Sequence, residues 1–186
     1  MAHSRVSDAQ LAETALELFR QQGYEGTSLN DLVAASGLEK ASLYYRFPGG
    51  KKDMVLAAAS HVGQWFEANI FAPLREPGPP VDRVKSVARR LRVFYGDGGK
   101  PCVLESLSLR GGPPELSNAL SDAYSAWVNA FAAVARESGM GRRLADDRAR
   151  QALIQIEGSL VLNRVTGNRK IFLDALSSLP DLLGRA

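Results

Sequence analysis

Cysteine and histidine are scarce in this sequence of 186 residues, which contains one cysteine, Cys102, and two histidines. A single cysteine excludes an intrachain disulfide. No cysteines and histidines have the spacing of a metal site, so we expect neither a metal nor a cofactor. Long apolar runs are also missing, which argues against a membrane-spanning helix. The opening residues MAHSRVSDAQ lack the apolar run of a signal peptide, and we expect a soluble cytoplasmic protein.

A large excess of charge of either sign is missing as well. The formal net charge is +3 and the isoelectric point is about 9.2. Residues 1–52 carry six basic and six acidic side chains, which cancel. The total charge therefore gives no argument for nucleic-acid binding. Nucleic-acid binding nevertheless stays a candidate function because of where the charges lie: four of those six basic residues fall between Lys40 and Lys52.

Helical periodicity runs through nearly the whole sequence, and 45% of the residues are apolar. Two capping pairs, Ser7 with Gln10 and Ser28 with Asp31, predict where the first two helices begin. Glycines predict where they end. We therefore expect three short helices in the first fifty residues, over Ser7–Gly23, Ser28–Gly37 and Glu39–Arg46.

Longer helices are predicted after the break at Pro48, Gly49 and Gly50. A fourth helix starts near Lys51 and ends in the EPGPP stretch at residues 76–80. No strand or hairpin signal appears, so the fold class is all-α. The later helices are expected at residues 84–94, 102–109 (a short helix or turn), 116–134, 146–165 and 168–183.

The second and third helices are joined by the tight turn Ala35-Ser36-Gly37-Leu38, which is the pattern of a helix-turn-helix. The stretch LFRQQGYEGTSLNDLVAASGLEKASLYYRF resembles the DNA-binding domain of the TetR family of transcriptional regulators. The following FPGGK turn resembles the subgroup of multidrug- and flavonoid-responsive repressors. This resemblance implies a DNA-binding domain over residues 1–50 and a ligand-binding and dimerisation domain over residues 51–186. It also implies a homodimeric repressor that binds a partly palindromic DNA operator and is released by a small effector.

The resemblance places the third helix in the major groove, so that its first residues reach base edges. The tyrosine hydroxyls and the lysines of the following turn would bind phosphates. Glu39 and Arg46 depart from the family pattern, which often has a small N-cap residue and a histidine there, and either change would alter the operator. The expected DNA contacts are Thr27, Ser28, Lys40, Ala41, Ser42, Tyr44, Tyr45, Arg46 and Lys51.

Two further sites are expected in the longer helices. Their large apolar residues exceed what one small core needs, which predicts a mainly apolar effector pocket lined by Trp65, Phe66, Cys102, Leu107, Trp127 and Phe131. A filled aromatic core is the alternative. The helix over 146–165 is apolar on two edges, which predicts a second subunit against it. The expected dimer contacts are Ile154, Gly158, Val161, Leu162, Phe172 and Leu176.

Two other classes remain open at this point. An enzyme with a phosphate-binding loop would need glycine where Tyr45 stands, and serine or threonine where Lys52 follows Lys51. Nucleophilic catalysis would have to combine Cys102 with a distant histidine. A helical small-molecule binder without DNA binding is the second alternative. The basic run Lys85, Arg89, Arg90 and Arg92 suggests a second DNA surface, but a solvated helix face is the simpler interpretation.

Overall fold

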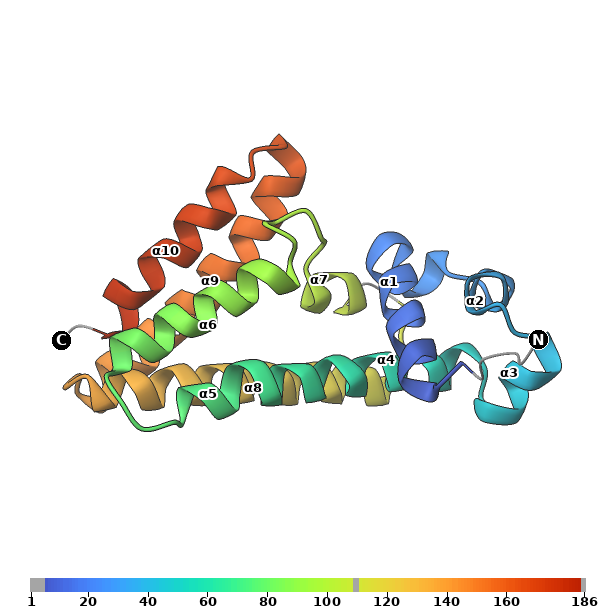
Figure 1. Cartoon of the computed structure of the whole chain (residues 1–186), viewed down its shortest axis with the longest axis horizontal. Coiled ribbons are helices and arrows are strands. Elements are labelled where there is room, and N and C mark those ends of the chain that lie inside the picture. The colour runs from blue at the N-terminus through green and yellow to red at the C-terminus, as the bar shows by residue number, and fades with distance from the viewer. Residues whose placement is uncertain (1–5, 109–110, 185–186) are drawn as a thin grey trace. The chain divides into compact units, whose positions relative to one another are not determined.

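Every regular element in the described part of the chain, residues 6–108 and 111–184 of the computed structural model, is a helix (Figure 1). The prediction of an all-α fold is therefore confirmed. The elements are α1 (Asp8–Gly26), α2 (Leu29–Ser36), α3 (Lys40–Arg46), α4 (Lys51–Phe66), the π-helical turn η1 (Glu67–Phe71), α5 (Ala72–Leu74), α6 (Pro80–Phe94), α7 (Val103–Ser108), α8 (Pro114–Glu137), α9 (Arg142–Thr166) and α10 (Lys170–Gly184).

The chain divides into two compact units. The first consists of Met1–Gln64 with Val103–Leu120, and the second of Trp65–Cys102 with Ser121–Ala186. The expected division by role, residues 1–50 against residues 51–186, stays a prediction, because compactness does not measure what each part binds. Within the described ranges, no helix is both long and apolar enough to cross a membrane.

The capping chemistry of the first unit matches the expectation from sequence. Ser7 and Ser28 each accept a hydrogen bond from the backbone N–H three residues later, and the partner side chain completes each capping box. Gly23 breaks α1 with a left-handed φ of 71°. In the same unit α1 packs against both α2 and α7. Local capping thus fixes the starts of α1 and α2, and packing against α1 holds α2 and α7 in the same unit.

The predicted fourth helix is more irregular than expected, because it is interrupted before Pro73. Proline has no N–H to donate to the carbonyl of Asn69. The backbone instead forms the π-helical turn η1, in which the Ala72 N–H donates to the carbonyl of Glu67. The guanidinium of Arg90 donates to the carbonyl of Asn69 at 3.1 Å. Arg90 therefore replaces the hydrogen bond that proline removes, which gives one member of the basic run a structural role.

In the second unit, α10 packs against both α6 and α9 (Figure 1). Fully buried side chains from each helix, among them Leu91, Phe172 and Leu179, form the core there. Phe172 meets the ring of Tyr95 edge to face, with ring centroids 5.8 Å apart. These contacts fix α10 beside α6, which is the arrangement that matters for the surfaces described below.

Two helix starts that differ from the sequence prediction have a local cause. Helix α9 begins at Arg142, one turn before the predicted start, because Gly141 supplies an extended N-cap and the polar first turn carries no apolar signal. Helix α10 begins at Lys170 because the side chain of Asn168 accepts a hydrogen bond from the Lys170 N–H at 3.1 Å. Leu109, at the end of the predicted helix over 102–109, lies outside the described residues.

Candidate nucleic-acid interface

The turn between α2 and α3 is closed by Gly37, which adopts a left-handed φ of 66°. A residue with a Cβ is strained in that conformation, so glycine is the natural end for α2. The hydroxyl of Ser36 accepts a hydrogen bond from the Leu38 N–H at 3.3 Å, which orders the turn further. Leu43 is fully buried on the inner side of α3 and so anchors that helix.

The outer side of α3 is open to solvent. Lys40, Ala41 and Ser42 are all exposed in its first turn. Tyr45 is 87% exposed, the most of any large apolar or aromatic side chain among the described residues. Glu39 is the N-cap residue, but its side chain makes no capping hydrogen bond. The helix therefore presents free backbone N–H groups, small side chains and one projecting phenol on a single side.

The two tyrosines of α3 are placed differently. The ring of Tyr44 lies against the Pro-Gly-Gly turn, where a Cβ on Gly50 would come within 3.4 Å of it. Gly50 also has a left-handed φ of 60°. Tyr44 thus packs one edge of its ring against the turn, and 44% of the residue remains exposed. Tyr45 projects freely, so it has the greater reach toward a DNA backbone.

The first turn of α4 carries a carboxylate that the sequence analysis did not consider. The backbone N–H of Gly49 donates to the Asp53 carboxylate at 2.7 Å. The ammonium of Lys51 lies over the ring of Tyr24, 4.2 Å from its centroid. Asp53 therefore occupies part of the predicted phosphate site, and Lys51 is held in place by a cation–π contact.

Lys52 is paired within the first unit. Its ammonium donates to the Glu115 carboxylate at 2.7 Å. The hydrogen bond from Lys52 is the main reason that the pKa of Glu115 lies below its usual value, and the same bond raises the pKa of Lys52. Both side chains are about half exposed. The ion pair therefore engages one cation of the predicted clamp with a carboxylate of the same unit.

Three of the predicted DNA contacts have structural tasks. Thr27 is fully buried and its hydroxyl donates to the Gly23 carbonyl at 2.8 Å, which removes it from the set. Ser28 is engaged in its capping box with Asp31. The guanidinium of Arg46 donates to the Val6 carbonyl, and it lies 3.3 Å from the Asp8 carboxylate. Arg46 thus fastens α3 to the start of α1, where no local signal in the sequence would have revealed it.

Comparison with known proteins decides the family. Residues 11–58 match the model for bacterial regulatory proteins of the tetR family. Residues 80–177 match the C-terminal domain model of the LmrA/YxaF-like transcriptional regulators. The chain belongs to the TetR family. It is therefore a transcriptional regulator and not an enzyme, which confirms the resemblance seen in the sequence.

Three known members illustrate the relationship of this TetR-family chain to others. It is 29% identical to the HTH-type transcriptional regulator LmrA of Bacillus subtilis, over 96% of this chain and 97% of that protein. It is 42% identical to the biofilm operon icaADBC negative transcriptional regulator IcaR of Staphylococcus aureus, over 22% of each chain. Its fold resembles that of CifR, a TetR-family regulator solved with a 26-base-pair operator, with a TM-score of 0.72 and 21% identity over 97% of this chain and 98% of that one.

Four of the six predicted pocket residues of this TetR-family chain, Trp65, Phe66, Trp127 and Phe131, belong to a packed aromatic cluster in the second unit. Trp127 is 3% exposed and contacts the rings of Phe66 and Phe131 edge to face, at centroid distances of 5.1 and 5.3 Å. Trp65 lies against Phe94 at 4.3 Å and remains partly exposed. The rings pack directly against one another, as in a hydrophobic core, and Trp65 forms the accessible edge of the cluster.

Two predicted pocket residues, Cys102 and Leu107, lie outside the aromatic cluster. The buried thiol of Cys102 donates to the Glu157 carboxylate of α9. Leu107 is buried in the first unit, on α7. Neither position adds a polar group to the aromatic cluster. Their role as effector contacts stays a prediction.

The predicted dimer residues divide into two groups. Ile154 and Leu162 are 70% and 53% exposed on the outer side of α9, and a Cβ on Gly158 would meet no other atom within 4 Å. Val161 is partly exposed beside them. Phe172 and Leu176 are buried within the unit. These two were assigned wrongly to the subunit interface, because their apolar stripe is covered by helices of the same chain.

Proposed function

We propose that this TetR-family regulator reads its operator through the outer side of α3. The proposal rests on the different exposure of the two sides of α3. Leu43 is buried on the inner side, whereas the outer side exposes Lys40, Ala41 and Ser42 together. Short side chains at the start of a recognition helix allow close approach to base edges. Tyr45 and Tyr44 supply hydroxyls for the phosphate backbone.

We further propose that the regulator acts as a homodimer through α9. Isolated exposed apolar residues are common, but Ile154, Leu162 and Val165 follow one helix and are 70%, 53% and 74% exposed. A groove between α9 and α10 borders them, and Gly158 and Ser159 form part of its lining. Two copies of this surface would pack α9 and α10 into a four-helix contact. Such a dimer presents two copies of α3 to a partly palindromic operator.

The effector is proposed to bind at the Trp65 edge of the aromatic cluster. The rings of Phe66 and Phe94 against Trp65 are apolar, so a neutral, mainly apolar or aromatic molecule fits. The effector would shift the protein between two states only if it binds one of them better. If the effector prefers the state in which the two α3 helices no longer match the DNA, its binding releases the protein from the operator.

Repression is the proposed direction of regulation, and the cytoplasm, where the operator lies, is the proposed location. A dimer on its operator can exclude other proteins from the same DNA. The negative regulation stated in the name of IcaR, which is similar in 41 residues, supports this direction. The regulator would then leave the operator when the effector binds.

A mobility-shift experiment on the DNA upstream of the gene tests the proposal. The wild-type protein is expected to shift this DNA and not a scrambled duplex of the same length. Ala41→Trp places a bulky ring on the outer side of α3 and is expected to abolish the shift. Ala59→Trp, on partly exposed α4, is the matched control. Equal binding by wild type and Ala41→Trp would show that α3 does not enter the groove.

A further inference from the structure

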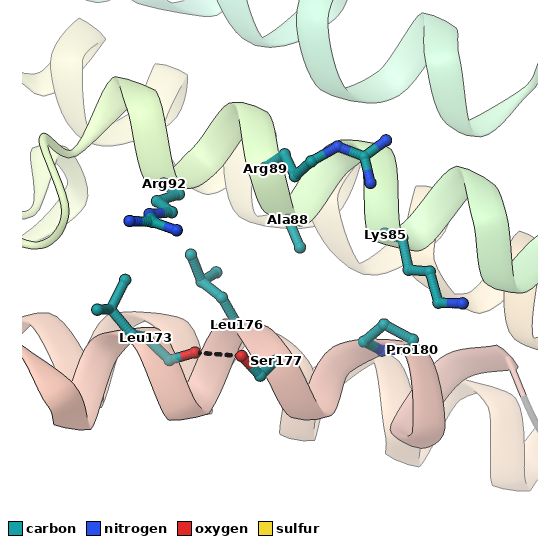
Figure 2. Close-up of a pocket in the computed structure, with 8 residues that line it drawn as sticks. All are labelled: Lys85, Ala88, Arg89, Arg92, Leu173, Leu176, Ser177 and Pro180. Carbon is teal, nitrogen blue, oxygen red and sulfur yellow. Dashed lines mark hydrogen bonds between the residues drawn. The ribbon is translucent and has the colours of Figure 1, made fainter.

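A groove of about 340 Å³ runs between α6 and α10 in the second unit (Figure 2). One wall is a single side of α6, with Lys85, Ala88, Arg89 and Arg92 at helical spacing. The other wall is a single side of α10, formed by Leu173, Leu176, Ser177 and Pro180. The eight described lining residues therefore include three cations and no carboxylate.

The three cations follow α6 over about 10 Å of helix length. Lys85 is 3.8 Å from the Asp82 carboxylate, and Arg92 is paired with Asp97. Arg89 lies between them, and among the residues that the structure describes no carboxylate forms an ion pair with it. A guanidinium presents a planar set of donors that matches a carboxylate in a bidentate arrangement. Arg89 is thus the lining cation that no described carboxylate pairs with, and in Figure 2 its side chain runs along α6 at the rim of the groove.

The remainder of the groove is apolar. Figure 2 shows Ala88 directed from α6 toward α10, with Leu173 and Leu176 directed back toward α6. The hydroxyl of Ser177 donates to the Leu173 carbonyl at 2.8 Å, so it is satisfied within its own helix. Pro180 adds an apolar ring at the Lys85 end of the groove. Ala88 and Leu173 are partly exposed, so an ion without an apolar part would leave them uncovered.

This groove is separate from the other surfaces of the second unit. On α10 its residues lie on the side opposite Ile171, Asp174 and Ala175, which border the proposed dimer groove. The aromatic cluster proposed for the effector lines neither groove. A molecule in the groove between α6 and α10 would therefore compete with neither the second subunit nor the proposed neutral effector.

We propose that this groove binds an amphiphilic carboxylate, a small molecule with an anionic head and an apolar body. Arg89 binds the carboxylate, Lys85 and Arg92 add positive potential on either side, and the apolar body lies along Ala88 and Leu173. A pocket that combines an apolar lining with a few convergent polar groups is the usual form of a small-molecule site. A solvated helix face explains the three cations but not the concave apolar wall opposite them.

Calorimetric titration of the full-length protein without DNA tests the site, with decanoate as the probe. Decanoate is expected to bind with one molecule per chain, and its affinity is expected to fall as salt is added. Decanol, which has the same apolar body without the charge, is expected to bind at least roughly tenfold more weakly. Equal affinity for the two would overturn the proposed role of the cations.

Variants locate the binding. Lys85→Gln/Arg89→Gln is expected to weaken decanoate binding by roughly tenfold or more. Arg142→Gln/Arg143→Gln makes the same charge change at two exposed positions of α9 and is expected to leave binding unchanged. Ala88→Trp fills the groove and is expected to abolish it. Unchanged decanoate affinity in the Lys85/Arg89 and Ala88 variants would overturn the proposal. Displacement of bound decanoate by a non-specific DNA duplex would assign the cations to DNA and would also overturn it.

Discussion

The ammonium of Lys52 and the carboxylate of Glu115 form an ion pair of 2.7 Å between residues that lie 63 positions apart. The pair joins the first turn of α4 to the first turn of α8 within one compact unit. The sequence predicts that the lysines of this turn bind DNA phosphates, so we expect the Glu115 carboxylate to compete with phosphate for Lys52. We therefore expect Glu115 to limit the affinity of this TetR-family regulator for DNA.

Replacing Glu115 with glutamine tests this competition. Glu115→Gln is expected to release Lys52 and to tighten operator binding by roughly two- to fivefold, the range expected for an exposed ion pair. The dependence of affinity on salt is expected to steepen by about one phosphate contact. Fluorescence anisotropy over a series of salt concentrations measures both. Glu76→Gln removes an equally exposed charge outside this pair and is the control; identical curves for the two variants would exclude competition.

Glu39 stabilises α3 less than a capping residue at the same position would. It stands at the N-cap with extended backbone angles but makes no capping hydrogen bond. Glu39→Ser is expected to add that bond and to raise the free energy of unfolding by about 0.5–2 kcal/mol. Glu39→Ala removes the charge without supplying a cap, so it separates the two effects. Urea denaturation would count against the capping argument if the serine and alanine variants were equally stable.

Gly158 provides a clean test of the dimer. A Cβ there meets no atom of the same chain within 4 Å, so Gly158→Arg is expected to leave the subunit folded. In a dimer through α9 the arginine would enter the interface, and sedimentation should show monomers at concentrations where the wild type is dimeric. Gly63→Arg, at an exposed helical glycine where a Cβ would likewise meet no atom within 4 Å, is the control. A dimeric Gly158→Arg protein would place the interface elsewhere.

The two tryptophans are expected to respond differently to truncation. Trp127 is 3% exposed among three aromatic rings, so Trp127→Ala should cost about 3–5 kcal/mol of stability. Trp65 lies at the accessible edge, and Trp65→Ala should cost less while abolishing the response of DNA binding to effector. Thermal melts and mobility shifts with and without effector measure the two properties. A full effector response in Trp65→Ala would remove that edge from the proposed site.

The capping box of α2 predicts a dependence of stability on pH. The Ser28 hydroxyl and the Ser28 N–H both donate to the Asp31 carboxylate. Both bonds lower the pKa of Asp31, and the bond from the hydroxyl has the larger effect. A carboxyl with a lowered folded pKa stabilises the protein above its unfolded pKa, near pH 4, and this contribution is lost as the pH falls through the folded pKa. The destabilisation caused by Ser28→Ala should therefore be larger at pH 7 than near pH 2. NMR titration should also show a higher pKa for Asp31 in the variant; an unchanged pKa would refute the assignment.

Much of the N-terminal part could be predicted from sequence, because its determinants are local. Ser7 and Ser28 cap helices through residues only three positions away, and Gly37 ends α2 through its own backbone angle. The spacing of Leu43 set the buried side of α3 and hence its outer side. Such features depend on neighbours along the chain, so the sequence alone determined the fold class, the exposed side of α3 and the family.

Other assignments were decided by tertiary structure alone. Periodicity showed that Phe172 and Leu176 lie on an apolar stripe, but it could not show whether that stripe faces a second subunit or the same chain. Thr27 and Arg46 were expected at DNA, yet their hydrogen-bond partners are backbone carbonyls of the same unit. The charge of Lys52 was evident from sequence, whereas Glu115 reaches it only because segments 63 residues apart pack together. An amino-acid pattern defines which surface a side chain belongs to, and the packing of distant segments decides what that surface touches.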